Sequence, residues 1–315
     1  MTSAVLGIGL LVVAVGAVVA RYVPIPGHRT LYVVIASPYL MAAAPLALLL
    51  LLWGHRWVMA AVAVCISVAL IVPQVPWYIA ASPNPNAVSV RAMTINMLYG
   101  RADPQSIVGI ATDQADVLMV QELTPDAAKG LSSGGIAKSF PYDALDPRPG
   151  TAGVGVYSRY PITAVNEIGG YALGLVTARI RVDGLTRDPT VASIHLTAPW
   201  PQPIDGWHRD LAALRSTLAG LAEESNGGAI LVGGDFNSTI DMEPFRKLLT
   251  DGYEDSAQQA GAGRQRTYPA NRRFPAFMGI DHILTRDCIA VSTETMELPG
   301  SDHRAVLATV MVPRD

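Results

Sequence analysis

The most informative stretch of the chain reads Ile230-Leu231-Val232-Gly233-Gly234-Asp235-Phe236-Asn237-Ser238. Its apolar start has the length of a buried strand, and two glycines then end the apolar pattern. Asp235 and Asn237 stand two positions apart, so on an extended segment their side chains project the same way. A carboxylate beside a carboxamide at a strand end suits a polar reacting group or a metal-bound water. A simple turn is the competing interpretation, since Gly, Asp and Asn are ordinary turn formers.

The composition divides the chain near residue 82. The sequence is 50% hydrophobic and only 16% charged, whereas globular chains average roughly 25% charged residues. Residues 1–82 contain no Asp or Glu and only three formal cations, which are Arg21, Arg29 and Arg56. All 26 acidic residues and all but three of the 23 basic ones lie beyond residue 82, so that part carries a net charge of −6. Proteins that bind duplex phosphates usually have a basic balance, so this composition weighs against a nuclease.

Two cysteines are present, Cys65 in an apolar run and Cys288 standing alone. Neither has a second Cys or a His at metal-ligand spacing. The cysteines therefore indicate neither a disulfide framework nor a thiolate metal site.

Three apolar stretches at the front, residues 4–20, 31–53 and 57–79, predict three transmembrane helices and a membrane anchor over residues 1–81. A bilayer core requires about 20 apolar residues in a helix, and prolines such as Pro38 and Pro45 are tolerated in membrane helices. Aromatic residues near the stretch ends fit the interfacial belts of membrane proteins. A signal peptide is the alternative for the first stretch, but no Lys or Arg precedes its apolar core.

The side of the membrane is less well defined by the sequence. Three spans place the loop 21–30 on the same side as everything after residue 80. That loop carries Arg21 and Arg29, and the opposite turn carries Arg56, so the positive-inside rule favours a cytoplasmic C-terminal domain by one residue. Residues 82–87 alternate Pro with polar residues, which predicts a short, stiff linker before a domain over residues 88–315.

Residues 88–315 combine strand-like and helical patterns. Asp103 before Pro104 predicts an N-cap and the first position of a helix that extends to residue 114. Further helices are expected at residues 205–224 and 242–249. Strands are expected at residues 88–96, 116–120, 153–158, 176–182, 190–196, 229–232, 280–285 and 305–312. This mixture predicts an α/β fold with two packed sheets and helices outside, and it places polar residues at strand ends, where loops gather.

Polar residues stand at five of these strand ends. Each has an ordinary interpretation alone, as a surface glutamate, a hydrogen-bonded core histidine or a turn. Their joint occurrence at strand ends favours a single site instead. The set comprises Asn96, Glu122, His195, Asp235 with Asn237, and Asp302 with His303, and Asp281 stands beside them.

In their order these segments resemble the endonuclease/exonuclease/phosphatase superfamily. The matching segments are Thr94-Ile95-Asn96, Gln121-Glu122, Gly155-Val156-Tyr157-Ser158-Arg159, Ser193-Ile194-His195-Leu196, Gly234-Asp235-Phe236-Asn237, Ile280-Asp281-His282-Ile283-Leu284 and Ser301-Asp302-His303. The resemblance covers the chain from about residue 88 to its end. It implies a four-layer α/β sandwich with two central mixed β-sheets.

The resemblance also implies roles in phosphoester hydrolysis. Glu122 would bind Mg²⁺, with Mn²⁺ as an alternative, and Asn96 and Asp302 would assist directly or through water. His303, oriented by Asp281, would act on the attacking water or hold the phosphoryl group. Asp235 would orient or deprotonate the water, while Asn237 and His195 would donate hydrogen bonds to the developing charge. The choice of general base between Asp235 and His303, and the number of metals, stay open.

A basic loop suggests the substrate. It carries Arg264, Arg266, Arg272 and Arg273 beside aromatic residues and would bind an anionic headgroup next to the bilayer. Tyr157 is a further candidate for substrate binding. We therefore expect a membrane-anchored phosphodiesterase or phosphatase that acts on a phospholipid or phosphoinositide headgroup, with no obligate protein partner. The alternatives are an anchored nuclease, with nucleic acid as substrate, and a catalytically silent binding module. Anchored bacterial relatives favour an extracytoplasmic domain.

Overall fold

The computed structural model describes residues 2–315, which fall into two compact units. The first holds the residues up to Pro76 together with Ile240–Arg246, and the second holds Trp77–Thr239 and Lys247–Asp315. The boundary therefore lies at Pro76, five residues before the expected end of the anchor. The reason is that the following residues bond to the second unit: the Gly263 N–H donates to the Trp77 carbonyl at 2.7 Å.

The first unit is made of apolar helices: α1 (Thr2–Ala20), α2 (His28–Leu40), α3 (Ala43–Trp53) and α4 (Trp57–Ile71), which continues as the 3₁₀ helix η1 (Val72–Tyr78). By length and composition two helical segments, Ser3–Ala20 and Trp57–Tyr78, are able to cross a membrane. The second expected span is broken, because α2 and α3 meet at an angle of 55°. At a rise of 1.5 Å per residue, α2 and α3 reach only about 20 Å and 17 Å, so they cross a bilayer only as a pair. The number of spans is thus two, or three if the bent pair is one.

Side-chain size follows the environment in this unit. The buried contacts between helices involve small residues such as Ala14, Ala44 and Ala63 together with Leu51, all of which are fully buried. Large apolar side chains such as Val12 and Val58 are exposed instead. Small residues inside and large apolar ones outside are typical of helices that face lipid.

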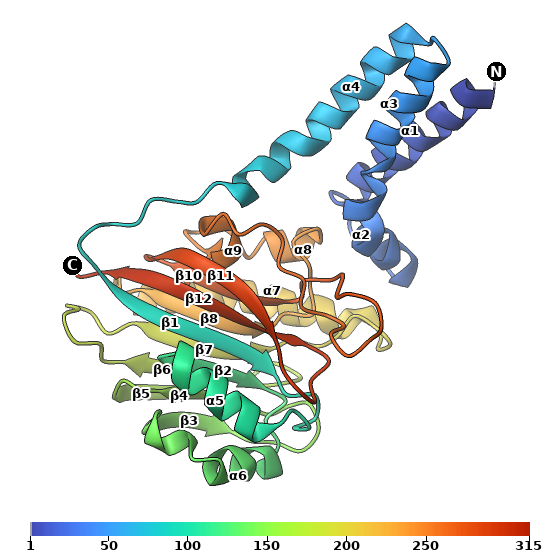
Figure 1. Ribbon diagram of the computed structural model, residues 1–315. Coiled ribbons are helices and arrows are strands. Elements are labelled where there is room, and N and C mark those ends of the chain that lie inside the picture. The colour runs from blue at the N-terminus through green and yellow to red at the C-terminus, as the bar shows by residue number, and fades with distance from the viewer. Residues whose placement is uncertain (1) are drawn as a thin grey trace. The chain divides into compact units, whose positions relative to one another are not determined.

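Two six-stranded sheets form the second unit (Figure 1). The first sheet has the order β11-β12-β1-β2-β4-β3, with β1 (Ala87–Asn96), β2 (Val117–Gln121), β3 (Tyr142–Asp146), β4 (Val154–Ser158), β11 (Ile289–Glu297) and β12 (Arg304–Pro313). The second has the order β5-β6-β7-β8-β10-β9, with β5 (Ile162–Glu167), β6 (Leu175–Ile180), β7 (Thr190–His195), β8 (Ile230–Asp235), β9 (Glu254–Asp255) and β10 (Asp281–Arg286). Both sheets are mixed, because β1–β2 and β7–β8 are parallel and the other pairs are antiparallel.

Helices complete the four-layer sandwich that the sequence predicts. Helices α5 (Pro104–Gln114) and α6 (Pro125–Ser133) cover the outer face of the first sheet and pack on Met93, Ile95 and Leu118. Asp103 caps α5 by accepting from the Ser106 N–H, as its position before Pro104 predicts. On the other side, α7 (Ile204–Glu224) buries a stripe of leucines at helical spacing. The expected helix at residues 242–249 is only the short α8 (Glu243–Arg246). The remaining short helices are η2 (Ile136–Lys138) and α9 (Ser256–Gln259).

The layer between the sheets changes character along the strands. On β1 the residues that face the second sheet run from Val90 and Ala92, which are in the apolar core, to Thr94 and Asn96. Strand β7 follows the same course from Val191 to His195. Asn96 at the end of β1 donates to Asp235 at the end of β8 at 3.0 Å, so the polar ends of both sheets lie together. The fold therefore has an apolar end and a polar end, and the polar end carries the predicted site.

His282, the residue after Asp281, points away from the site and into a buried ion pair. Its Nδ1 lies 2.7 Å from Asp255 Oδ2, and its Nε2 lies 3.0 Å from the Ser238 carbonyl oxygen. Both partners accept hydrogen bonds, so both ring nitrogens carry protons and the ring is an imidazolium. Burial alone would lower the pKa of His282, but the hydrogen bond to Asp255 and its charge raise it. His282 is thus a structural residue.

We expect His282→Ala to destabilise the protein by about 3–5 kcal/mol, because it leaves the Asp255 carboxylate buried without its partner. The folded-state pKa of His282 is raised, so its contribution is fully present below the unfolded value of about 6.5 and is lost as the pH rises through the folded value. Thermal unfolding of the full chain in detergent should therefore separate wild type from variant most strongly near pH 6 and less in alkaline solution. A difference that does not change with pH would contradict the imidazolium assignment.

Candidate active site

Two of the predicted site residues, Asp235 and Asn237, lie at and just after the carboxyl end of β8, which reads Gly233-Gly234-Asp235. Gly234 is required there, since a Cβ would lie 1.9 Å from the Ile194 carbonyl oxygen of β7. Asp235 Oδ1 accepts from the Asn237 N–H at 2.8 Å, and Asn237 has a left-handed φ of 48°. The segment therefore turns immediately after the strand. The Asn237 amide is directed to the Leu196 carbonyl at 2.8 Å and to His195 Nε2 at 3.4 Å.

Asn96 joins the two sheets at the site. Its Nδ2 donates to Glu122 Oε1 at 3.1 Å and to Asp235 Oδ2 at 3.0 Å. Its Oδ1 accepts from the Leu98 N–H at 2.9 Å and keeps a second lone pair. The second oxygen of Glu122 accepts from the Tyr99 N–H. In this arrangement Asn96 orients the two carboxylates, and a role of its own oxygen toward a cation stays a prediction.

Glu122 is held in an unusual backbone conformation. It is 7% exposed and has a φ of 55°, which non-glycine residues rarely adopt. The next residue fixes it: the Leu123 N–H donates to the Gly153 carbonyl at 2.9 Å, and the Leu123 carbonyl accepts from the Arg148 N–H at 3.1 Å. A Cβ at Gly153 would lie 2.0 Å from the Leu123 carbonyl oxygen. Glycine at 153 is thus needed for the approach that positions Glu122.

His303 stands between three carboxylates. Its Nδ1 lies 2.8 Å from Asp281 Oδ2, and its Nε2 lies 3.8 Å from Asp235 Oδ2 and 3.9 Å from Asp302 Oδ1. Burial alone would lower the pKa of His303, but the charges of Asp281 and Asp235 raise it to about 10. The ring is therefore an imidazolium at neutral pH, oriented by Asp281 as the sequence predicts.

His195, in contrast to His303, has a lowered pKa and is a neutral imidazole. Its Nδ1 donates to the Thr151 carbonyl at 2.9 Å, because a carbonyl oxygen only accepts. Burial lowers the pKa of His195, so the neutral ring carries a lone pair on Nε2, which faces the Asn237 amide. His195 donates from Nε2 only when it is protonated.

The pKa of the Asp235 carboxyl group is raised to the neutral range. It is 2% exposed, and burial, followed by the charge of Asp281, raises its pKa to about 7. A carboxylate with a pKa near the working pH is suited to accept a proton from water. Burial also raises the pKa of Glu122.

The donor set fits a divalent cation. Asp302 Oδ1 is buried and has no hydrogen-bond partner, as expected of an oxygen that a cation would satisfy. Ligand atoms of Asp235, Asp281 and His303 lie within 4.8 Å of one another and form a second acidic group nearby. Carboxylate oxygens are the ligands that Mg²⁺ and Mn²⁺ prefer. Glu122 and Asp302 are the better candidates, because the His303 imidazolium has no lone pair for a cation and Asp281 is paired with it.

The substrate-binding candidates are separated by the structure. Tyr157 does not reach the site: it is 2% exposed and packs in the core under α5 and α6. Val154 and Val156 of β4 face the second sheet, so the alternation of the strand turns Tyr157 to the other side. The prediction that Tyr157 contacts the substrate is therefore wrong. Arg272 and Arg273 are exposed at the tip of a hairpin, whereas Arg264 and Arg266 lie in the segment that leads to it.

Tyr268 is a residue of the site that the sequence analysis did not identify. Its ring centroid lies 4.9 Å from that of His303. Burial and the charge of Asp302 raise the pKa of Tyr268, and the charge of Arg272 opposes them. The backbone bridge between Tyr268 and Met278 closes the hairpin, and the Ala270 N–H donates to the Asp302 carbonyl at 2.6 Å. The basic hairpin therefore starts beside the catalytic cluster.

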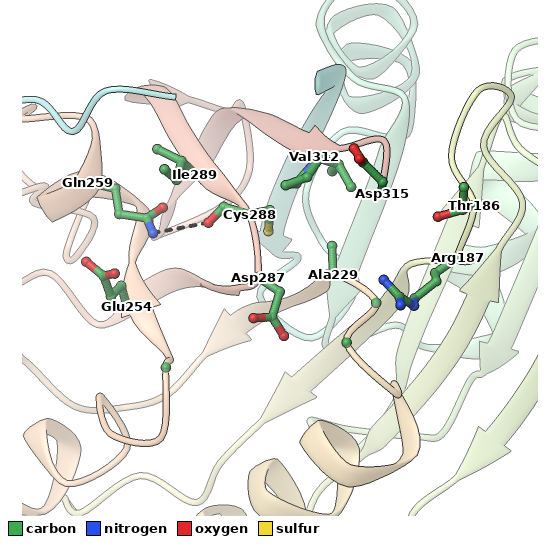
Figure 2. Close-up of a pocket in the computed structure, with 14 residues that line it drawn as sticks. Thr186, Arg187, Ala229, Glu254, Gln259, Asp287, Cys288, Ile289, Val312 and Asp315 are labelled. Atoms are coloured by element: carbon green, nitrogen blue, oxygen red, sulfur yellow. Dashed lines mark hydrogen bonds between the residues drawn. The ribbon is translucent and has the colours of Figure 1, made fainter. Parts of the chain in front are cut away.

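A separate pocket of about 460 Å³ lies at the apolar end of the fold (Figure 2). It is lined at the start of β8 by Ala229, at the end of β10 by Asp287 and Cys288, and at the end of β12 by Val312. Arg187 lies on one wall, and Glu254 and Gln259 lie on the other (Figure 2). None of the predicted catalytic residues lines this pocket.

Two stacked mixed sheets covered by helices form a four-layer α/β sandwich, and carboxylates and imidazoles gather at one end of it. The chain belongs to the endonuclease/exonuclease/phosphatase family, whose sequence model matches residues 93–303. The matched range begins on β1 and ends at His303. Members of this family are hydrolases that act on phosphoester bonds.

Solved structures share the fold. The endonuclease/exonuclease/phosphatase from Bacteroides vulgatus is 18% identical, covers 71% of this chain and 99% of its own, and gives a TM-score of 0.58. D. rerio TDP2 complexed with single-strand DNA product is 16% identical, with 70% and 98% coverage and a TM-score of 0.57. A family protein from Leptotrichia buccalis is 17% identical, with 70% and 99% coverage and a TM-score of 0.54. No curated protein sequence matches the chain.

Proposed function

We propose that this protein is a membrane-anchored, divalent-metal-dependent phosphoester hydrolase that acts on a phospholipid or phosphoinositide headgroup. The family supplies the reaction class, and the apolar helices supply the anchor. The choice of a lipid substrate rests on one observation, the exposed aromatic and basic hairpin that begins at the catalytic cluster.

The chemistry follows from the site. Glu122 and Asp302 would hold the cation, which would supply positive charge to stabilise the phosphoryl and leaving oxygens. Asp235, with its pKa near neutrality, takes the proton of the attacking water. The His303 imidazolium, held by Asp281, donates from Nε2 to the phosphoryl group. Asn96 keeps the Glu122 and Asp235 carboxylates apart and oriented.

Exposed aromatic rings lie on chain segments that lead away from the site. Phe274 and Phe277 on the hairpin are 53% and 38% exposed, and their ring centroids are 6.0 Å apart. Tyr99 and Trp200 are also exposed and follow β1 and β7, the strands that end at Asn96 and His195. Aromatic side chains favour the lipid interface, and neighbouring arginines attract anionic headgroups. This aromatic rim supports a substrate presented at a membrane surface.

The test compares substrates and one rim variant. Purified full chain with Mg²⁺ is incubated with phospholipid or phosphoinositide in mixed micelles, with plasmid DNA and with a soluble aryl phosphodiester. We expect hydrolysis of a lipid phosphoester and of the soluble diester. Phe274→Ser with Phe277→Ser should lower the lipid rate about tenfold, equivalent to about 1.4 kcal/mol, and leave the soluble diester rate unchanged.

The matched control is Tyr142→Ser, which removes an exposed aromatic ring at the start of β3, away from the rim. It should change neither rate. Cleavage of DNA alone, or equal loss on both substrates in the rim variant, would refute the lipid assignment.

A nuclease is the second candidate. Its support is the structural similarity to D. rerio TDP2 in complex with single-strand DNA product. Aromatic rings and arginines also stack on unpaired bases. The net charge of −6 beyond residue 82 opposes this candidate, since nucleic-acid binding usually requires a basic surface. A catalytically silent binding module is the third candidate, and it predicts no turnover on any of the three substrates.

The location of the catalytic domain is also a proposal. We place it on the extracytoplasmic side, although the positive-inside rule favours the cytoplasmic side by one arginine. The test is a fusion after Asp315 to a reporter that is active only in the cytoplasm. Activity of this fusion would overturn the assignment.

A further inference from the structure

The two halves of the catalytic cluster come from different sheets. Glu122, Asn96, Asp302 and His303 belong to the first sheet or follow its strands. His195, Asp235 and Asp281 belong to the second. The candidate cation ligands are thus all on one sheet, and the proposed base is on the other. Hydrolysis therefore requires the two sheets to keep a fixed alignment.

Next to the site, on the side of the apolar core, the fully buried side chains of Thr94, Gln121 and Ser193 form a chain of hydrogen bonds that links the two sheets. Thr94 Oγ1 on β1 donates to Gln121 Oε1 on β2 at 3.1 Å. Gln121 Nε2 then donates to Ser193 Oγ on β7 at 3.0 Å. Ser193 Oγ returns to the first sheet by donating to the Val120 carbonyl at 3.0 Å. Within the site itself, hydrogen bonds from Asn96 to Asp235 and between His303 and Asp281 also join the two sheets. Away from the site the facing residues form an apolar core, so this set of hydrogen bonds, here called the polar tier, is the next contact with directional bonds between the sheets.

The position of the polar tier relates it to the reacting groups. Gln121 immediately precedes Glu122, and Ser193 lies two residues before His195 on the same face of β7. Ser193 is also paired across the sheet with Gly233, two residues before Asp235. A Cβ at Gly233 would lie 3.2 Å from Thr94 Cβ and 2.4 Å from the Met119 side chain. The sheets thus approach each other closely at the polar tier.

We propose that Gln121, through Ser193, is a positioning residue that sets the alignment of the cation-binding sheet against the sheet that carries the base. This inference rests on the proposed function. Gln121 touches no substrate. Apolar packing is non-directional, so it stabilises the pair of sheets without fixing their relative shift. A buried hydrogen-bonded amide has one geometry that satisfies it, and any other leaves a buried polar group unpaired.

The test uses Gln121→Met and Ser193→Ala, which remove the bonds and nearly preserve volume. Each should lower kcat on a soluble aryl phosphodiester by about tenfold, the lower end of what supporting residues typically contribute. The Mg²⁺ dissociation constant, measured by calorimetry, should stay within about twofold because the candidate ligands share one sheet. The double variant should lose no more than either single variant, since both break the same bond.

The control is Gln259→Met. Gln259 is a buried glutamine with three hydrogen bonds, to Cys288, Thr285 and Ala290, at the apolar end of the fold. It should lower the unfolding temperature and leave kcat unchanged. Gln121→Met with wild-type kcat, a kcat loss matched by loss of Mg²⁺ affinity, or an equal kcat loss in Gln259→Met would each overturn the proposal.

Wild-type turnover tests the proposed function separately. If the wild-type chain hydrolyses no phosphoester, the proposed function fails, and the ring ¹⁵N shifts of His195 decide the positioning role. Gln121→Met should move those shifts and Gln259→Met should not. Unmoved shifts in Gln121→Met would overturn the proposal.

Discussion

Asp235→Asn is expected to reduce kcat by about 10³-fold, within the range that general-base residues contribute. The amide cannot accept a proton, and its neutral side chain removes a charge that supports the His303 imidazolium. The size of the side chain is retained, and its oxygen still accepts from the Asn237 N–H, so the turn after β8 should persist. KM should change little, because the residue acts on water. The measurement is steady-state kinetics on a soluble aryl phosphodiester from pH 5.5 to 9.

The wild-type rate should rise with pH through about 7, as Asp235 loses its proton, and the variant should lack this rise. Asp183→Asn is the matched control, since Asp183 is an exposed carboxylate in the turn between β6 and β7. It should keep the wild-type rate and pH profile. A variant at Asp235 with more than about a tenth of wild-type kcat would assign the base elsewhere, with His303 the remaining candidate.

Glu122→Gln should weaken Mg²⁺ binding by at least about tenfold and lower kcat on the order of 10³-fold, as expected when a metal that stabilises several kcal/mol of developing charge is poorly held. The substitution removes the negative charge. Both oxygens of Glu122 accept hydrogen bonds, from Asn96 and from Tyr99. The substitution replaces one of these oxygens by an NH₂ group, which cannot accept. One donor is then left without a partner, which costs about 1–3 kcal/mol of stability.

Calorimetric titration with Mg²⁺ and Mn²⁺ measures this prediction without relying on turnover. Glu254→Gln serves as the control, because Glu254 is an exposed carboxylate at the apolar end of the fold. Unchanged cation affinity in Glu122→Gln would move the cation to the group formed by Asp235, Asp281 and His303.

The central strands were predictable and the edge strands were not. Strands β1, β2, β7, β8 and β12 have apolar runs long enough to indicate a buried strand, and each was expected within a few residues of its position. The strands without a prediction are β3, β5, β9 and β11, and these are the four edges of the two sheets. Strand β5 is almost entirely exposed. An edge strand is specified by its pairing partner, so its own sequence carries little apolar periodicity.

The site was predictable because its residues stand at strand ends, where the chain leaves the sheet. The positions of Asn96, Glu122, Asp235 and His303 within one hydrogen-bonded and charged cluster confirm the predicted convergence. The prediction that Tyr157 binds substrate is wrong because a motif match does not tell which face of a strand a residue occupies. The contributions of Gly153, Tyr268 and Gln121 depend on close approaches between segments far apart in sequence, which local patterns do not encode.

The most direct test is hydrolysis of a soluble aryl phosphodiester by the purified full chain, first stripped with EDTA and then resupplied with Mg²⁺ or Mn²⁺. A single cation site held by Glu122 and Asp302 of the first sheet predicts no turnover after stripping, recovery on adding either ion, and no recovery in Glu122→Gln. Turnover that survives EDTA, or wild-type protein that remains inactive with both ions, would contradict it.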